Sequence, residues 1–124
     1  MNITTIRNQN IAVIDKNNQI ADPQNILDIM ATAGYQYNCI GIVLYQESLG
    51  ENFFNLKTGF AGEILQKFSN YHFKLAIVGD FSQYDSKSLK DFIYECNKGN
   101  SIYFKNDLNS ALSSLVPENP GKAD

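Results

Sequence analysis

Two runs of consecutive apolar residues predict the central strands of a sheet. Residues 39–45 read CIGIVLY and residues 73–78 read FKLAIV, and both are of strand length with almost no alternation of polar positions. Such runs are typical of strands that helices cover on both faces. We expect the two strands to lie side by side and parallel, joined by a helix.

Apolar residues with helical spacing lie between these runs and on either side of them. Phe60, Ile64 and Phe68 recur at every fourth position and predict an amphipathic helix between the two strands. A helix is predicted from Asp22-Pro23, with Gly34 ending it in a left-handed conformation. Two more helices are predicted, one after Asp85 or Ser86 and ending at Gly99, the other after Asn106 or Asp107 and ending before Pro117.

The remaining β-prone segments complete a predicted α/β domain. Residues 3–7 and 10–15 predict a hairpin that turns at Asn8-Gln9, and residues 101–105 predict a last strand. Residues 46–52 are mostly polar and predict a loop. The predicted order is β-β-α-β-α-β-α-β-α, a mostly parallel sheet with an antiparallel hairpin at one edge. We expect one domain over residues 1–116 and a disordered tail over residues 117–124.

Charge and cysteine content exclude several classes of protein. The 124 residues carry a net charge of −3 with no basic stripe, so we expect no nucleic-acid partner. No apolar run approaches the roughly 20 residues that a membrane-spanning helix needs, so we expect no membrane partner. Cys39 and Cys96 belong to no CxxC pair and no apolar leader precedes Ile3. These features indicate reduced thiols in a cytoplasmic protein.

Polar residues after the parallel strands form the candidate ligand site, because ligands of open α/β sheets usually bind beyond the carboxyl ends of the strands. With the predicted helix start and one aromatic wall, the candidate ligand-binding residues are Glu47, Ser48, Lys57, Thr58, Asp80, Ser82 and Tyr84.

Each of these residues also has a structural interpretation. Lys57-Thr58-Gly59 lacks the glycine-rich phosphate-loop pattern, so helix capping is favoured over nucleotide binding. Asp80 and Glu47 could form a carboxylate pair, but a turn in which Asp80 accepts from the amide of Ser82 is favoured. The sequence indicates no catalytic residues, no metal site and no cofactor.

Three strings carry a resemblance to a known family: LKTGFAGEILQKF (residues 56–68), KLAIVGDFS (residues 74–82) and SKSLKDFIYECNKGN (residues 86–100). They resemble the bacterial family numbered 4180 among the domains of unknown function. The resemblance extends to about Leu115 and implies a bacterial or phage origin, but no activity.

The order of elements is also remotely similar to STAS domains, the fold of anti-sigma-factor antagonists. That family has a phosphorylatable Ser or Thr in the region that residues 47–58 occupy here. The usual Asp-Ser or Asp-Thr pair is missing, because Ser48 follows Glu47 and Thr58 follows Lys57. A phosphorylation switch at either residue is left as an open alternative.

Two functional hypotheses follow, and an enzyme ranks third. The first is a STAS-like regulatory or protein-interaction module without catalytic machinery, which binds a protein partner or forms a homodimer. The alternative is a protein that binds a nucleotide or another small anionic ligand at the carboxyl ends of the parallel strands.

Overall fold

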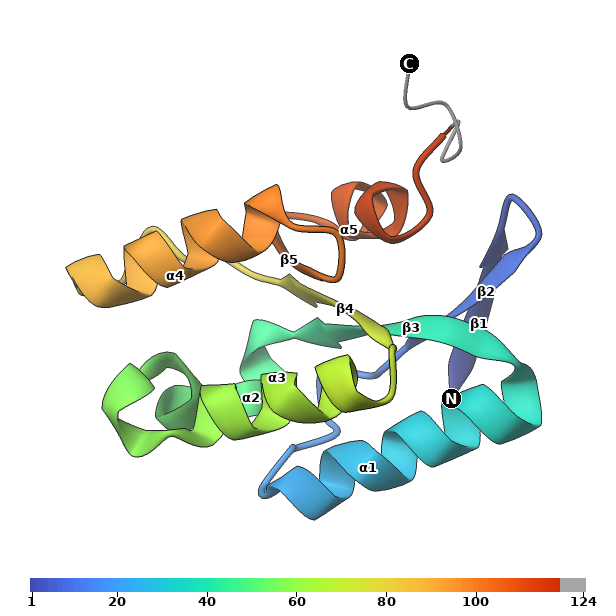
Figure 1. The fold of residues 1–124 in the computed structure, drawn as a ribbon, viewed down its shortest axis with the longest axis horizontal. Coiled ribbons are helices and arrows are strands. Elements are labelled where there is room, and N and C mark those ends of the chain that lie inside the picture. Colours follow the sequence, from blue (N-terminus) through green and yellow to red (C-terminus); the bar gives the residue numbers. More distant parts are fainter. Residues whose placement is uncertain (119–124) are drawn as a thin grey trace.

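Five strands follow the order of the chain in a single sheet, β1-β2-β3-β4-β5 (Figure 1). The computed structural model describes residues 1–118. Its strands are β1 (Asn2–Ile6), β2 (Gln9–Val13), β3 (Cys39–Tyr45), β4 (Lys74–Val78) and β5 (Ile102–Lys105). Its helices are α1 (Pro23–Ala31), α2 (Gln46–Phe54), α3 (Phe60–Asn70), α4 (Lys87–Lys98) and α5 (Leu108–Leu115), with a π-helical turn η1 (Thr32–Gln36) and a 3₁₀ turn η2 (Leu56–Thr58).

The pairing of the strands confirms the predicted sheet. β1 and β2 are antiparallel, whereas β2, β3, β4 and β5 are parallel to one another. Val43 of β3 pairs with Ala76 of β4, so the two apolar runs are parallel neighbours. The antiparallel hairpin lies at one edge of the sheet, as predicted.

Sheet order determines where the helices lie. Parallel connections are right-handed, and each connection here moves one strand further in the same direction, so every connecting helix falls on one face of the sheet. The larger core lies on that face, where Ile42, Leu44 and Ile77 pack against residues of α1, α2, α3 and α4. α5 follows the last strand and has no such constraint. It packs on the opposite face, where Leu112 and Leu115 join Val43 and Ala76 in a smaller core (Figure 1).

Two cationic side chains hold the C-terminal end of α5. Arg7, in the turn of the β1–β2 hairpin, donates to the carbonyl oxygen of Val116 from Nε at 3.2 Å and from Nη2 at 2.6 Å. Lys74 of β4 donates from Nζ to the carbonyl oxygen of Leu115 at 3.2 Å. Cations are favoured at this end of a helix because its last carbonyls carry partial negative charge. The hairpin and α5 are therefore tied together across the second face of the sheet.

Starts of helices are mostly where the sequence placed them. Asp22 caps α1 and accepts from the amide of Asn25, Ser86 caps α4 and accepts from the amide of Leu89, and Asp107 caps α5. These caps work because the first amides of a helix have no partner within it.

Three local predictions are wrong. Residues 46–52 are not a loop but most of α2, which is kinked at Gly50 and buries Leu49 and Phe53, one on each side of the kink, in the core. Gly34 does not end the first helix, since the chain continues through η1 and Asn38 adopts the left-handed conformation with φ 56°. The hairpin turns at Arg7 and Asn8, which have φ 48° and 70°, one residue earlier than predicted.

Residues 119–124, which include most of the predicted tail, lie outside the described residues. Within residues 1–118, no helix is both long enough and apolar enough to cross a membrane.

Candidate functional site

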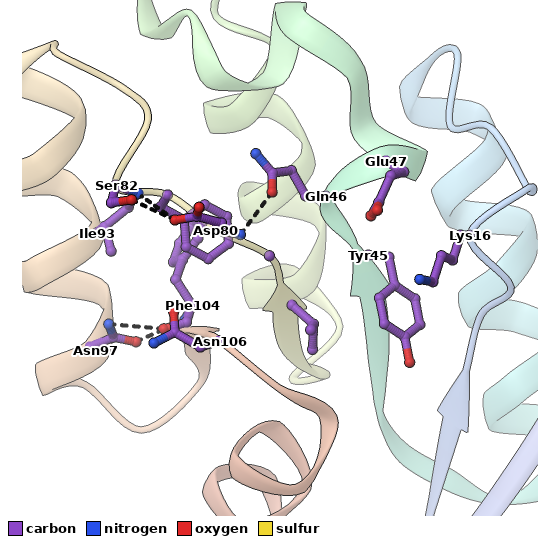
Figure 2. Close-up of a pocket in the computed structure, with 13 residues that line it drawn as sticks. Lys16, Tyr45, Gln46, Glu47, Asp80, Ser82, Ile93, Asn97, Phe104 and Asn106 are labelled. Atoms are coloured by element: carbon purple, nitrogen blue, oxygen red, sulfur yellow. Dashed lines mark hydrogen bonds between the residues drawn. The ribbon is translucent and has the colours of Figure 1, made fainter.

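An open cleft of about 830 Å³ lies at the carboxyl ends of the parallel strands. Its walls come from the segments that follow β2, β3, β4 and β5, together with one side of α4 (Figure 2). Glu47, Asp80 and Ser82 line the cleft, so the structure brings these three predicted site residues together.

Gln46 connects the ends of β3 and β4. Its Oε1 accepts from the backbone amide of Asp80 at 2.9 Å, and its Nε2 donates to the hydroxyl of Tyr84 at 2.9 Å. The same side chain passes over Gly79, where a Cβ atom would come within 2.6 Å of the Cβ of Gln46. The Gln46 side chain therefore links the end of β3 to the end of β4.

Asp80 forms the turn that the sequence predicted. Its Oδ1 accepts from the amide of Ser82 at 3.1 Å and from the Ser82 hydroxyl at 2.6 Å. The hydrogen bonds from the Ser82 side chain and backbone lower the pKa of Asp80 below its usual range. The carboxylate stays ionised at neutral pH, which does not suit the role of a general acid.

The remaining charges make the cleft slightly acidic. Lys16 lies over the ring of Tyr45, with 5.4 Å between Nζ and the ring centroid, on the side of the cleft that carries Glu47 (Figure 2). One ammonium therefore faces two carboxylates, so the cleft favours a neutral or cationic ligand over a phosphate. Within the described residues, no three His, Cys, Asp or Glu side chains gather as a metal site would require.

Asn97 of α4 uses both ends of its amide on the edge of the sheet. Its Oδ1 accepts from the amide of Phe104 at 2.8 Å and its Nδ2 donates to the Phe104 carbonyl at 3.2 Å. With Gln46, Asp80 and Ser82, this makes four polar side chains of the cleft that are engaged in internal hydrogen bonds. The cleft is thus built largely to hold strand ends in place.

The other predicted site residues do not line the cleft. Ser48 is 1% exposed, and its hydroxyl lies 3.1 Å from the carbonyl oxygen of Lys16, to which it donates. The Thr58 hydroxyl donates to the carbonyl of Asn52 at 2.7 Å and accepts from the amide of Phe60 at 3.2 Å. Thr58 precedes Gly59, which is the N-cap of α3, so its side chain forms a local turn before the helix and is not the helix cap that the sequence favoured.

Lys57 and Tyr84 are also not among the residues that line the carboxyl-end cleft. Lys57 lies beside Thr58 in η2 and does not line the cleft. Tyr84 stacks on Phe54 with 5.0 Å between ring centroids and 17° between ring planes, and it contacts the cleft through Gln46.

Lys16 and Asn97 are among the cleft residues that were not predicted from the sequence. Lys16 follows β2, and the rule used for β3 and β4 would have found it once β2 was recognised as their parallel neighbour. Asn97 lies inside a helix pattern, where nothing in its spacing indicates that it reaches a strand.

A second groove of about 520 Å³ lies at the opposite, amino end of the strands. It lies between α1–η1 and the segment that joins α3 to β4, and Met30, Gly34, Tyr35, Tyr71 and Phe73 are among the residues that line it. Tyr35 is 93% exposed and Tyr71 is 63% exposed. No site was predicted from the sequence at this end of the sheet.

The structure is that of a small α/β protein with a mostly parallel five-stranded sheet. A larger core lies on one face of the sheet and a smaller core on the other. The chain belongs to the family described as Domain of unknown function (DUF4180), whose model matches residues 6–115. This match confirms the family resemblance of the three strings and assigns no activity. No curated protein and no solved structure matches the chain.

Proposed function

We propose that this protein is a non-enzymatic protein-interaction module that binds its partner at the amino end of the sheet. The observation that carries the proposal is the pair of exposed rings, Tyr35 and Tyr71, beside the partly apolar groove that Met30 and Phe73 also line. Tyrosine is enriched at protein interfaces because one rigid side chain supplies both a large apolar ring and a hydroxyl. The remote similarity to STAS domains is consistent with a regulatory partner.

Backbone geometry around the groove supports the same proposal. The rim contains the π-helical turn η1, and such turns are frequent at functional sites. Asn38 and His72, which follow the two helices that end here, have left-handed backbones with φ 56° and 55°. Local strain of this kind tends to gather at functional sites.

Site-specific photocrosslinking tests the proposal. A benzoylphenylalanine in place of Tyr35 is expected to give a discrete covalent adduct in lysate of the source cells. The matched control carries the same group in place of Tyr94, a tyrosine of α4 that is 63% exposed and does not line the groove. The adduct should also be lost when Tyr71→Ala is added. No adduct at position 35, or equal adducts at positions 35 and 94, would refute binding at this end of the sheet.

A homodimer is one form of this function, and the same experiment detects it. An adduct of twice the chain mass, together with a dimer by light scattering, would identify a second copy as the partner.

Binding of a small ligand in the carboxyl-end cleft is a second candidate function. It is favoured by the position of Glu47, Asp80 and Ser82 in one cleft of about 830 Å³. A ligand at 100 times its dissociation constant should raise the free energy of unfolding by about 2.7 kcal/mol. Thermal-shift screening with nucleotides, neutral metabolites and organic cations tests this. A hit that Asp80→Asn does not weaken would place the ligand elsewhere, and no shift across the panel would remove the candidate.

A further inference from the structure

The groove at the amino end has aromatic walls and one acidic group. Tyr35 comes from η1, whereas Tyr71 and Phe73 both come from the connection between α3 and β4, so three rings approach the groove from two segments. Asp28 of α1 also lines it. Its Oδ1 accepts from Nε2 of Gln24 at 3.0 Å, and the carboxylate takes part in no salt bridge within residues 1–118.

Helix direction adds to the negative character of this end. Helices of parallel β-α units run opposite to the strands, so α1–η1 and α3 both end beside the groove, at Gln36 and Asn70. The C-terminal end of a helix carries partial negative charge. At the end of α3, the backbone amides of Tyr71, His72 and Phe73 already donate to three of the last carbonyl groups, so this contribution is modest. No Lys or Arg of the described residues lines the groove, and Lys67 in the last turn of α3 is not part of its wall. The groove therefore complements a cation.

Aromatic faces and a carboxylate together select the kind of cation. Cations bind over the faces of tyrosine and phenylalanine rings, and arginine does so more often than lysine. A guanidinium is also planar, weakly hydrated and able to hydrogen-bond a carboxylate through two N–H groups. A compact ammonium would gain less from the flat rings and lose more hydration.

We propose that this groove binds an arginine side chain of the protein partner, with the guanidinium against Tyr35, Tyr71 and Phe73 and its N–H groups directed at Asp28. The proposal rests on the proposed function and names the chemistry of its partner.

Titration with short blocked peptides, followed by amide NMR, tests this chemistry. The first peptide has one arginine between glycine and serine residues. The second has citrulline in place of that arginine, which keeps the shape and removes the charge. The arginine peptide is expected to shift the amides of Gly34, Tyr35 and Phe73, and the citrulline peptide is expected to leave them unshifted.

Two variants test the roles of the groove residues. Asp28→Asn keeps the side-chain shape and should lower the affinity for the arginine peptide about threefold, the ratio expected of an exposed charge pair. Tyr71→Ala should lower this affinity, whereas Tyr94→Ala should not, and both tyrosines are 63% exposed in the wild type. The amide spectrum of each free variant shows whether it is folded.

Equal shifts by the citrulline peptide, or an affinity that neither Asp28→Asn nor Tyr71→Ala changes, would overturn the assignment of arginine. The crosslinking result separates this from failure of the proposed function. An adduct at position 35 without groove shifts by the arginine peptide would mean that a protein binds here by other chemistry. If both experiments fail, the interaction function itself is wrong.

Discussion

His72 has a backbone conformation that its side chain disfavours. It follows the end of α3 with φ 55°, in the position that glycine most often occupies after a helix. A left-handed conformation costs a residue with a Cβ about 1–2 kcal/mol, and glycine's extra entropy loss on folding offsets about 0.5–1 kcal/mol of that. His72→Gly should therefore raise the free energy of unfolding by about 0.5–1 kcal/mol in urea titrations. His72→Ala is the control and should bring no such gain, and a less stable glycine variant would contradict the argument.

Asp107 gives the stability of the protein a dependence on acid. Hydrogen bonds from the backbone and side chain of Ser110 lower the pKa of this carboxyl below its ordinary value of 3.8. Because the pKa is lower in the folded state, the ionised carboxylate stabilises the fold above pH 3.8, and that contribution is lost as the pH falls through the lowered pKa.

Replacement of Asp107 separates its charge from its capping. Asn also caps helices well, so Asp107→Asn should keep a near-normal Tm at pH 7 and lose less of it on acidification than the wild type. Asp107→Ala removes the cap and should lower Tm at both pH values. An asparagine variant with the acid sensitivity of the wild type would show that other carboxylates cause it.

Individual elements differ in how much of them the sequence could predict. β3 and α4 were predicted closely because their signals are local: a continuous apolar run in residues 39–45, and apolar positions at helical spacing between Ser86 and Gly99. α2 was missed because its polar positions resemble a loop and Gly50 interrupts it with φ 72°. This short helix is stabilised by tertiary contacts such as the packing of Leu49 and Phe53 into the core, and that packing depends on the sheet.

The joint between β3 and β4 depends on a glycine. Gly79 has no Cβ, and Gln46 occupies the space that a Cβ would need. Gly79→Ala should displace Gln46, break its hydrogen bonds to Asp80 and Tyr84, and destabilise the fold by about 1–3 kcal/mol. Urea titration measures the change.

A double-mutant cycle identifies the cause. When Gln46→Ala is already present, Gly79→Ala should cost less, because the side chain that it would displace is gone. Costs that simply add would mean that Gln46 is not what requires the glycine.

At the scale of the molecule, the two clefts were unequally predictable. Ligands of open α/β sheets usually bind at the carboxyl ends of the strands, and from this rule Glu47, Asp80 and Ser82 could be predicted to lie in one cleft. The amino-end groove joins Asp28 and Tyr35, which lie seven residues apart on α1–η1, to Tyr71, which is far from both in the sequence. Their proximity follows from two helices that end at the same edge of the sheet, so only the assembled fold shows it.

The closure of the second face depends on contacts between distant parts of the chain. α5 is the helix that packs in the smaller core, and Arg7 connects the carbonyl of its C-cap residue, Val116, to the hairpin at the far edge of the sheet. Arg7→Ala should lower the free energy of unfolding by about 1 kcal/mol, at the low end for a charged hydrogen bond because Arg7 is exposed. Hydrogen exchange should speed up in α5 and in β1, while amides of β3 and β4 should change only with global stability.

Lys87→Ala removes an exposed cation from the i,i+4 pair with Asp91 on α4 and serves as the control, with a small effect on stability and no local change of exchange in α5. Equal exchange in α5 of the wild type and Arg7→Ala would show that Lys74 and the apolar contacts of Leu112 and Leu115 hold this helix without the hairpin.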